Sequence, residues 1–321
     1  MPTISVVIPT YNRADLLPKA IRSVLEQTFA DFELIVVDDG STDTTRQAIA
    51  DFHDQRIRYI YQPNRGISAA LNSGIRAAQG QFMARLDSDD TWLPTLLELE
   101  AAAFTEHPHV DIVYAQAQSV DTTGRLLSSR IGRPERYPGQ PFKSILCGDF
   151  RCSITSLIRM ECLERVGLFD ETLKGNEDWD LGIRLARYYR FYFLPQVLAH
   201  FLYHPKRTTG ASSSLFAEIV NSRLTPLDKA FAESNLPSDV QAVRSLAYRN
   251  AYIEMALLWK SVGESGKARH AYMAAVKASG NPLATLAHIL FIQLFNRVFN
   301  RYAWMRQTFE GAAALRRKIR K

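Results

Sequence analysis

The sequence predicts an α/β fold in which a mostly parallel sheet has helices on both faces, followed by an all-helical C-terminal region. Three observations lead to this prediction. In residues 1–90, short apolar runs rich in β-branched residues alternate with amphipathic stretches, which is the pattern of parallel strands joined by helices. Polar loops follow three of these runs. From about residue 215 helical periodicity replaces the strand pattern.

Four apolar runs bounded by polar or turn residues predict strands, at residues 4–8, 32–37, 56–61 and 82–86. Amphipathic stretches between them predict helices, at residues 15–27, 42–53 and 67–78. We expect Ser41 to cap the second of these helices, because a Ser hydroxyl can accept a free backbone amide at a helix start. Ligands of such sheets bind outside the carboxyl ends of the strands, so the loops there are the first candidates for function.

Polar loops follow three of the predicted strands, at residues 9–13, 38–43 and 87–90. Two of these loops are acidic. The chain contains neither the dinucleotide motif GxGxxG nor the phosphate loop GxxxxGK[ST], which argues against a dinucleotide-binding Rossmann unit and a P-loop enzyme. A diphosphate bound at this edge would need a cation, held on carboxylates, to offset its charge.

The run Asp87-Ser88-Asp89 has the composition of a divalent-cation loop. Mg²⁺ and Mn²⁺ can take one or two protein carboxylates and fill their remaining positions with water and substrate phosphates. The alternative is that these acids cap the following helix, where negative charge is favoured. Asp38 and Asp39 have a similar alternative as turn residues, since Asp-Gly is a common turn pair.

Four motifs resemble, in order, the signatures of family 2 glycosyltransferases, and the resemblance covers roughly residues 3–213. The motifs are Ile8-Pro9-Thr10-Tyr11-Asn12-Arg13, Val37-Asp38-Asp39-Gly40-Ser41-Thr42-Asp43, the NxGxxxAxNxG stretch from Asn64 to Gly74, and Leu86-Asp87-Ser88-Asp89-Asp90. Each would be weak alone, but four in the right order make chance a poor explanation. The chain departs from the family at Leu71, where many members carry Arg, so one donor contact is either missing or supplied by Arg65.

The resemblance implies a GT-A type catalytic domain over residues 1–213, with a nucleotide-binding half at 1–90 and an acceptor-binding half at 91–213. It implies that the nucleotide-sugar donor contacts Pro9, Tyr11, Asn12, Asp38, Asp39, Arg65, Asn72, Asp87 and Ser88. Asp39, with Asp38 beside it, would bond the base or ribose, which favours uracil or thymine. The alternative for Tyr11 is a simple packing aromatic.

The same resemblance implies a bound Mn²⁺ or Mg²⁺. Its expected ligands are Asp87, Asp89 and His204. His204 belongs to a His-Pro segment, followed by Ser212 and Ser213, that is similar to the family's late segment near the diphosphate. The alternative for His204 is an ordinary packing or hydrogen-bonding role, which is common for a lone histidine.

The acceptor half must supply a base, because a hydroxyl attacks an anomeric carbon well only as its proton leaves. Glu177 and Asp178 precede an amphipathic stretch, and the segment resembles the family's ED motif. By that resemblance Asp178 is the catalytic base and Glu177 a neighbouring orienting or acceptor-binding carboxylate. The alternative is that both acids merely begin a helix.

Residues 214–321 form the predicted helical C-terminal region, with helices expected at 215–232, 238–262 and 266–278. Ala256, Tyr272 and Ala275 stand at the spacing of a tetratricopeptide-type helical hairpin. Residues 283–305 predict a helix with one apolar and one basic face. Residues 297–321 hold eight Lys or Arg against one Glu, a net charge of +7 in a chain of +6, so the basic charge is local.

Residues 283–321, the amphipathic basic tail, predict a peripheral contact with an anionic membrane surface. Because the basic charge is confined to this tail, nucleic acid is not expected as a partner. The alternative is a helix packed on the protein or in an oligomer interface. The chain shows no secretory signal and no apolar run long enough to span a membrane, so we expect a cytoplasmic protein, peripheral on the inner face of the membrane.

The predicted function is inverting transfer of a sugar from a UDP- or dTDP-sugar to a hydroxyl of a saccharide or lipid-linked acceptor, in the synthesis of cell-surface polysaccharide or glycoconjugate. Inversion is implied by the resemblance. One alternative is a sugar-phosphate nucleotidyltransferase, which would carry a glycine-rich phosphate loop that residues 10–13 lack. Another is a non-catalytic scaffold that binds nucleotide sugars. The presence of both Asp87-Ser88-Asp89 and Glu177-Asp178 argues against it, because a scaffold does not need both acidic motifs.

Overall fold

The computed structural model describes residues 2–150, 154–204 and 215–292, and only the backbone of residues 128–130. The chain divides into two compact units, Met1–Ala247 and Tyr248–Lys321. The functional boundaries expected at residues 90 and 213 stay predictions. Ser212, Ser213 and most of the predicted amphipathic helix lie outside the described residues.

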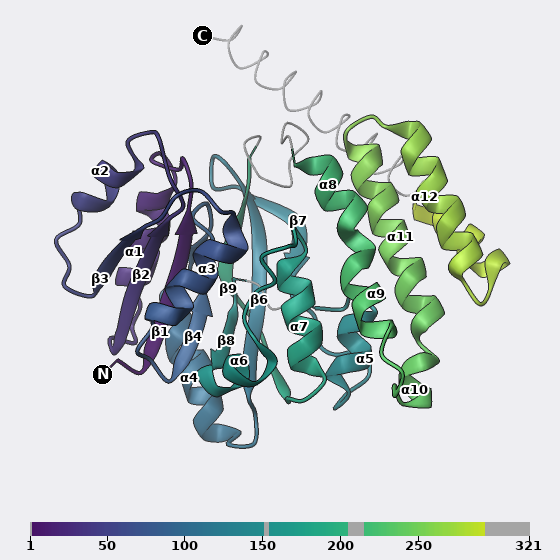
Figure 1. Ribbon diagram of the computed structural model, residues 1–321, viewed down its shortest axis with the longest axis horizontal. Helices are drawn as coiled ribbons and strands as arrows, with labels where there is room; N and C mark the ends of the chain where they lie inside the picture. Colours follow the sequence, from purple (N-terminus) through teal and green to yellow (C-terminus); the bar gives the residue numbers. More distant parts are fainter. Residues whose placement is uncertain (1, 151–153, 205–214, 293–321) are drawn as a thin grey trace, which may run out of the picture. The chain divides into compact units, whose positions relative to one another are not determined.

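The first unit is built on one sheet (Figure 1). Its strands are β1 Ile4–Thr10, β2 Phe32–Asp38, β3 Ile57–Tyr61, β4 Phe82–Arg85, β5 Thr91–Trp92, β6 Ile112–Asp121, β7 Leu126–Ile131, β8 Ser156–Arg159 and β9 Phe191–Tyr203. Within the described residues they lie in the order β3-β2-β1-β4-β8-β6-β9-β5, with β7 paired to β6.

The helices of this unit connect or follow the strands. They are α1 Leu17–Leu25, α2 Thr45–Ala50, α3 Ile67–Ala77, α4 Leu96–Glu106, α5 Pro141–Leu146, α6 Met160–Val166, α7 Glu177–Ala186, α8 Phe216–Asn221, α9 Thr225–Phe231 and α10 Ser238–Gln241. The predicted fold class is confirmed: β1 to β4 are mutually parallel with crossover helices, and a helical region follows. The strand β8, antiparallel to β4 and β6, begins the mixed half of the sheet.

Two apolar cores lie on opposite faces of the sheet, because successive strand side chains point to opposite faces. Ile4, Val6 and Ile8 face a core completed by α1 and α4, and Val7 faces a second core completed by α3, α6 and α7. In Figure 1 these last three helices lie on the near side of the sheet. Since both faces are covered, β1 and β2 are buried throughout, including their polar residues Ser5 and Glu33, whose side chains bond each other at 2.8 Å.

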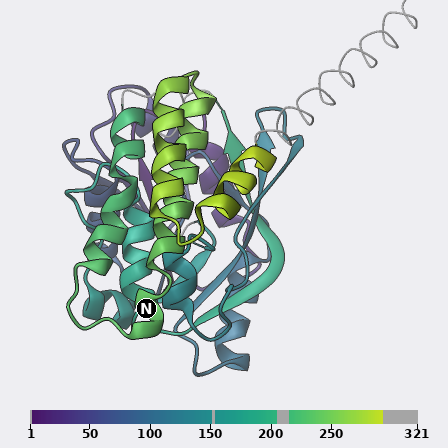
Figure 2. The same cartoon turned by 90° about the vertical axis from the view of Figure 1, so that its right-hand side faces the viewer.

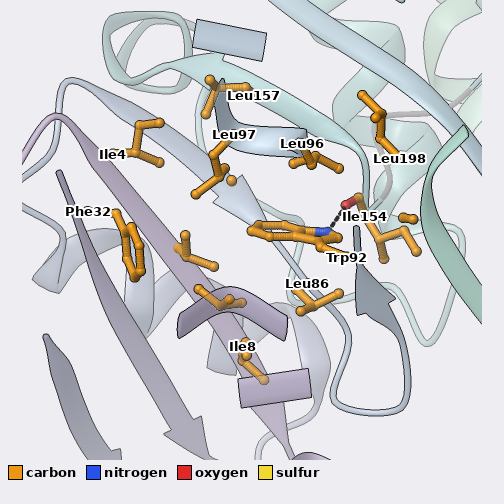
Figure 3. Close-up of a cluster of buried hydrophobic side chains, with 14 of the residues drawn as sticks. Ile4, Ile8, Phe32, Leu86, Trp92, Leu96, Leu97, Ile154, Leu157 and Leu198 are labelled. Carbon is orange, nitrogen blue, oxygen red and sulfur yellow. Dashed lines mark hydrogen bonds between the residues drawn. The ribbon is translucent and has the colours of Figure 1, made fainter. Parts of the chain in front are cut away.

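A buried tryptophan lies in the first core. Figure 3 shows Trp92 among leucine and isoleucine side chains, with its indole Nε1 donating to the Ile154 carbonyl at 2.6 Å. This bond satisfies the polar atom of a side chain that is otherwise an apolar core residue. It also ties the segment after β4 to the segment before β8.

The predicted cap of α2 is wrong. The helix begins at Thr45 after Thr44, and the Thr45 amide donates to the Asp43 carboxylate at 3.0 Å. The Ser41 hydroxyl instead accepts a hydrogen bond from the Asn12 amide at 2.9 Å. The reason is tertiary: the loops after β1 and β2 are neighbours, and the hydroxyl serves the contact between them.

Two predicted C-terminal helices are each divided in two. Residues 215–232 form α8 and α9 with the 3₁₀ turn Ser222–Leu224 between them. Pro226 lies in the first turn of α9, the position where a missing backbone donor costs least, so it marks a new helix start. Residues 238–262 form α10 and α11 Arg244–Ser261.

The second unit contains most of α11, α12 Ser265–Ala278 and a helix that starts at Pro282. α11 and α12 lie side by side (Figure 2). Ala256, Tyr272 and Ala275, which predicted a helical hairpin, are buried between them, and Ile289 of the following helix joins this cluster. Among the described residues, no helix has the length and apolar character needed to cross a membrane.

Glu100 on α4 is fully buried, and neither carboxyl oxygen has a hydrogen-bond partner among the described residues. Burial raises the pKa of this carboxyl well above its usual range. The folded state therefore holds a proton that the unfolded state loses above about pH 4.5. The protonated Glu100 therefore favours the folded state fully below about pH 4.5, and this contribution to the free energy of unfolding is lost as the pH rises toward the folded pKa.

We expect Glu100→Gln to stabilise the protein more at pH 8 than at pH 5. Between the unfolded and folded pKa values of Glu100, the free energy of unfolding falls by about 1.4 kcal/mol for each unit that the pH rises. Gln does not titrate, so the variant lacks this loss. Thermal melting of both proteins at the two pH values measures the difference. A difference in Tm that does not depend on pH would contradict a protonated Glu100.

Candidate active site

The candidate site lies at the carboxyl edge of the parallel strands, where β1 and β2 end in register at Thr10 and Asp38. The loop after β1 is held to the loop after β2. Asn12, in the left-handed region with φ 51°, accepts hydrogen bonds on Oδ1 from the amides of Thr42 at 2.8 Å and Asp43 at 3.3 Å. The two loops thus form one surface, as their positions after adjacent strands predicted.

The predicted donor residues of the first loop differ in exposure. Pro9 is buried within β1, beside Val37. Tyr11 is 46% exposed, and both its expected contact with the nucleotide and the packing alternative stay predictions. An exposed ring at a strand end is available to stack on a planar ligand.

Asp38 and Asp39 are both buried, and donors of the chain itself bind each carboxylate. Asp38 accepts from the Ser41 amide at 2.8 Å and from the Tyr59 hydroxyl at 2.9 Å. Burial, with the hydrogen bond to Asp38, raises the pKa of Tyr59 to about 12. Tyr59 therefore stays a neutral donor that fixes the orientation of Asp38.

Asp39 connects the end of β2 to the start of α3. Its Oδ1 accepts from the Gln62 side chain at 2.7 Å and the Arg65 amide at 3.0 Å, and its Oδ2 accepts from the Gly66 amide at 2.8 Å. Gly66 precedes α3 with φ 91°, a conformation that L side chains rarely adopt. Asp39 therefore shapes the loop, and its expected contact with the base stays a prediction.

Asn72 and Arg65, the predicted donor residues of α3 and its preceding loop, both bind Glu171. The buried Asn72 amide group donates to Glu171 at 2.9 Å and exchanges two bonds of 2.9 Å with the Phe169 backbone. The more exposed Arg65 guanidinium lies 2.8 Å from Glu171. Asn72 thus fastens α3 to the segment before α7, and its expected contact with a donor stays a prediction.

The structure reveals a buried arginine that sequence reasoning missed. Arg85, the last residue of β4, places Nε 2.8 Å and Nη2 3.3 Å from the two carboxyl oxygens of Asp87. Its Nη1 donates to Glu177 at 3.2 Å, 92 residues away in the chain. Burial lowers the pKa of Arg85, but the charges of Asp87 and Glu177 outweigh burial, so its pKa is raised.

A sequence signal for Arg85 did exist. It is the one charged residue of the apolar run at residues 82–86, and it stands two residues before Asp87, on the same side of an extended chain. A buried charge is stable only when it is paired. The run thus held a signal for an ion pair that was not used, although it held none for the second partner.

The predicted metal ligands do not gather into one cluster. Asp87 pairs with Arg85, whereas Asp89 Oδ2 lies 3.0 Å from the Nε2 of the buried His204. Groups of three metal-binding side chains are absent from the described residues. A carboxylate oxygen and an imidazole nitrogen that already face each other fit a divalent ion that takes its remaining ligands from water and phosphate.

The two predicted acceptor-side carboxylates begin α7. Glu177 is 7% exposed, and burial raises its pKa against the opposing charge of Arg85. Asp178 is half-buried and accepts the Trp179 amide on Oδ1 at 2.8 Å. The helix-start alternative is thus partly correct, since one oxygen of Asp178 bonds the first turn of α7.

Residues of α8 and of the 3₁₀ turn that follows it are hydrogen-bonded to Asn176, the residue before α7. Asn176, left-handed with φ 63°, donates to the Ile219 carbonyl at 3.0 Å and accepts from Arg223 at 2.6 Å. On the next turn of α7, Asp180 lies 3.0 Å from Arg184, which also donates to the Val166 carbonyl. These contacts fix the direction in which Glu177 and Asp178 leave the helix.

Comparisons with known proteins agree with this architecture. Residues 5–167 match the model of Glycosyl transferase family 2. An uncharacterised glycosyltransferase of Rickettsia prowazekii is 33% identical over 221 residues, which are 68% of this chain and 69% of that protein. A chondroitin synthase of Escherichia coli is 27% identical over 71% of this chain and 33% of its own length.

Two solved structures share the fold. The Staphylococcus aureus protein TarS, residues 1–349 with UDP-GlcNAc, is 20% identical with a TM-score of 0.62 over 86% of this chain and 81% of that one. The Pyrobaculum calidifontis mannosyltransferase PcManGT, with GDP-Man and Mn²⁺, is 21% identical with a TM-score of 0.60 over 94% and 83%. At these identities the likeness concerns the fold alone.

Proposed function

The chain belongs to glycosyl transferase family 2 and is a glycosyltransferase, and on that premise we propose that it transfers a sugar, with inversion, from a nucleotide diphosphate donor to an acceptor hydroxyl. The observation that carries this proposal is the Arg85 bridge. It brings the acidic loop after β4 and the acidic start of α7 to one place. A donor loop and a base beside each other are what such a transfer needs.

In the proposed reaction Asp178 accepts the proton of the acceptor hydroxyl through the oxygen not bonded to Trp179. The hydroxyl oxygen forms a bond to the anomeric carbon as the bond to the leaving diphosphate breaks on the opposite side. Glu177, held by Arg85, orients the start of α7 and does not take up the proton. Holding the two reactants in line contributes part of the acceleration by itself.

Asp89 and His204 are the residues that would hold a divalent cation. Mn²⁺, which accompanies GDP-Man in PcManGT, suits this oxygen and nitrogen pair, and Mg²⁺ is the second candidate. A bound cation would offset the negative charge of the departing nucleoside diphosphate. In this arrangement Asp87 and Ser88 serve the donor without binding the metal directly, because Arg85 already occupies the Asp87 carboxylate.

We propose a UDP- or dTDP-sugar as donor, because TarS holds UDP-GlcNAc and a carboxylate such as Asp38 or Asp39 can accept the N3–H of uracil or thymine. Pro9, Tyr11 and Asn12 would border that nucleotide. The proposed acceptor is a saccharide or a lipid-linked saccharide in cell-surface polysaccharide synthesis. Its support is the likeness to a chondroitin synthase, of which this chain spans about a third.

The experiment is a screen of nucleotide sugars with Mn²⁺ or Mg²⁺, with and without saccharide acceptors, for release of the nucleoside diphosphate. We expect release with a uridine or thymidine donor and both product and release with an acceptor. A guanosine donor as the sole substrate would contradict the base preference. Release of pyrophosphate from a sugar phosphate and a nucleoside triphosphate would favour the nucleotidyltransferase alternative.

We also propose a cytoplasmic protein that contacts the inner face of the membrane through the amphipathic basic tail. In the described start of this region, Thr285 and Ile289 are buried within the second unit. Leu283, Leu286 and Leu290 are 81%, 45% and 57% exposed. The helix thus packs on the unit by one face and leaves a separate apolar stripe open, next to the sequence that carries a net charge of +7.

Vesicle binding tests this contact. We expect the full chain to bind vesicles that contain phosphatidylserine, more weakly as salt rises, and a chain ending at Asn281 to bind at least tenfold more weakly. Leu286→Ser with Leu290→Ser should weaken binding at every salt concentration, since it removes apolar burial alone. Equal binding by the full and shortened chains would favour the packing or oligomer alternative.

A further inference from the structure

The ion pairs of Arg85 join two parts of the site that contribute different chemistry. The Asp87 carboxylate, 26% exposed, belongs to the loop that carries Asp89, and the Glu177 carboxylate, 9% exposed, begins the helix that carries Asp178. The Arg85 side chain between them is 8% exposed. One buried cation is thus shared by two carboxylates from different halves of the chain.

The geometry of the guanidinium makes this sharing possible. Its Nε and Nη2 atoms engage both oxygens of Asp87, and Nη1 points to Glu177. A planar fork with fixed donor directions holds both partners at a defined angle, which a single ammonium group cannot do. The guanidinium also lies 5.8 Å from the centre of the Phe169 ring. The backbone of Phe169 is in turn hydrogen-bonded to the Asn72 side chain.

Loss of the cation would leave Asp87 and Glu177 without their shared partner, beside the adjacent carboxylate of Asp178. Uncompensated buried charges repel one another and draw apart or toward water. The loop of Asp89 and the first turn of α7 would then both move. Misplacement of a reacting group by about 1 Å can cost on the order of 10²-fold in rate.

We propose that Arg85 is a positioning residue that fastens the loop of Asp89 to the helix of Asp178, so that metal–nucleotide binding and proton transfer depend on one side chain. The inference rests on the proposed function. Substitution of Arg85 should therefore lower both kcat and the affinity for UDP–Mn²⁺. Substitution of Asp178 should lower kcat alone, and substitution of Asp89 should lower the affinity first.

The test compares Arg85→Met, Arg85→Lys and a control, Arg58→Met. Arg58 also pairs with a largely buried glutamate, Glu33 at 2.5 Å, but both residues lie near the amino ends of β3 and β2, away from the site. The affinity for UDP with Mn²⁺ is measured by calorimetry, and kcat is measured at saturating donor and acceptor. Thermal melting confirms that each variant is folded.

We expect Arg85→Met to weaken UDP–Mn²⁺ binding by roughly 10-fold or more and to lower kcat by about 10²-fold. Arg85→Lys should recover part of the binding and little of kcat, because the ammonium keeps the charge and loses the fork. Arg58→Met should change melting and leave both readouts near the parent's. Since Arg85→Lys keeps the charge in the buried cluster, it serves as the folded variant if Arg85→Met does not fold.

Two results would overturn the inference while the parent remains active. One is an Arg85 variant that loses kcat with unchanged UDP–Mn²⁺ binding, which would remove the link to the metal loop. The other is an equal loss of both readouts in Arg58→Met, which would reduce the effect to general stability. A parent protein that binds no UDP–Mn²⁺ and transfers no sugar would instead overturn the proposed function, and this inference with it.

Discussion

Asp178→Asn should bind UDP with Mn²⁺ about as tightly as the parent and transfer sugar roughly 10²- to 10⁴-fold more slowly. The substitution keeps the shape of the side chain and removes its basicity. Its effect falls on turnover because the proposed role of Asp178 is to accept the proton of the acceptor, while the donor is held by other loops. Calorimetry for binding and single-turnover kinetics for transfer separate the two quantities.

Glu177→Gln is the matched comparison, since Glu177 is the adjacent carboxylate on the same helix turn. We expect a smaller loss of turnover than in Asp178→Asn. Gln still accepts a hydrogen bond from Arg85, and only the charge of the ion pair is lost. Near-parental turnover in Asp178→Asn together with a large loss in Glu177→Gln would exchange the two roles. Full activity in both variants would place the base elsewhere and leave this motif as a helix start.

Asp89→Ala should lower transfer by about 10³-fold or more and weaken UDP–Mn²⁺ binding. Charge offset by a bound cation contributes several kcal/mol to such reactions, and each 1.36 kcal/mol is tenfold in rate. His204→Ala should act in the same direction, because His204 faces the same carboxylate at 3.0 Å. Titration of the apoprotein with Mn²⁺ in the presence of UDP measures the affinity directly.

Asp54→Ala is the control for charge. Asp54 pairs with Arg56 at 2.8 Å just before β3, at the edge of the sheet opposite the site. It should leave transfer and Mn²⁺ affinity near the parent's. Full activity of the parent in excess chelator, or of Asp89→Ala without any change in Mn²⁺ affinity, would contradict a cation held by Asp89.

The pattern of residues 1–90 predicted the elements closely because their signals are local. The runs at β1 and β2 are mostly apolar, with Ser5 and Glu33 as their internal polar members, and such runs belong to central strands buried on both faces. The amphipathic stretch at residues 67–78 corresponds to α3 within one residue. The helices expected at 215–232 and 238–262 were predicted too long, because periodicity alone shows neither a 3₁₀ turn nor a new start at Pro226, whereas the one at 266–278 matches α12 within one residue.

The sequence also determined where candidate chemistry would be found, since the ends of parallel strands meet at one edge. That edge carries Asp38, Asp39 and the loop of Asp89. Motif order further indicated the family, which the match over residues 5–167 shows. The residues expected to contact the donor stay predictions, and the structure adds that Asn72 and Asp39 already bind the chain's own groups.

What only the tertiary structure decided is how each carboxylate is paired. Asp87 and Asp89 are indistinguishable in the sequence as two acids of one loop, yet one pairs with Arg85 and the other with His204. The pairing of Arg85 with Glu177 joins residues 92 positions apart. Periodicity and capping reflect contacts within a few residues, whereas a buried ion pair forms where packing of α7 against the sheet places both charges out of water, so it follows from the fold.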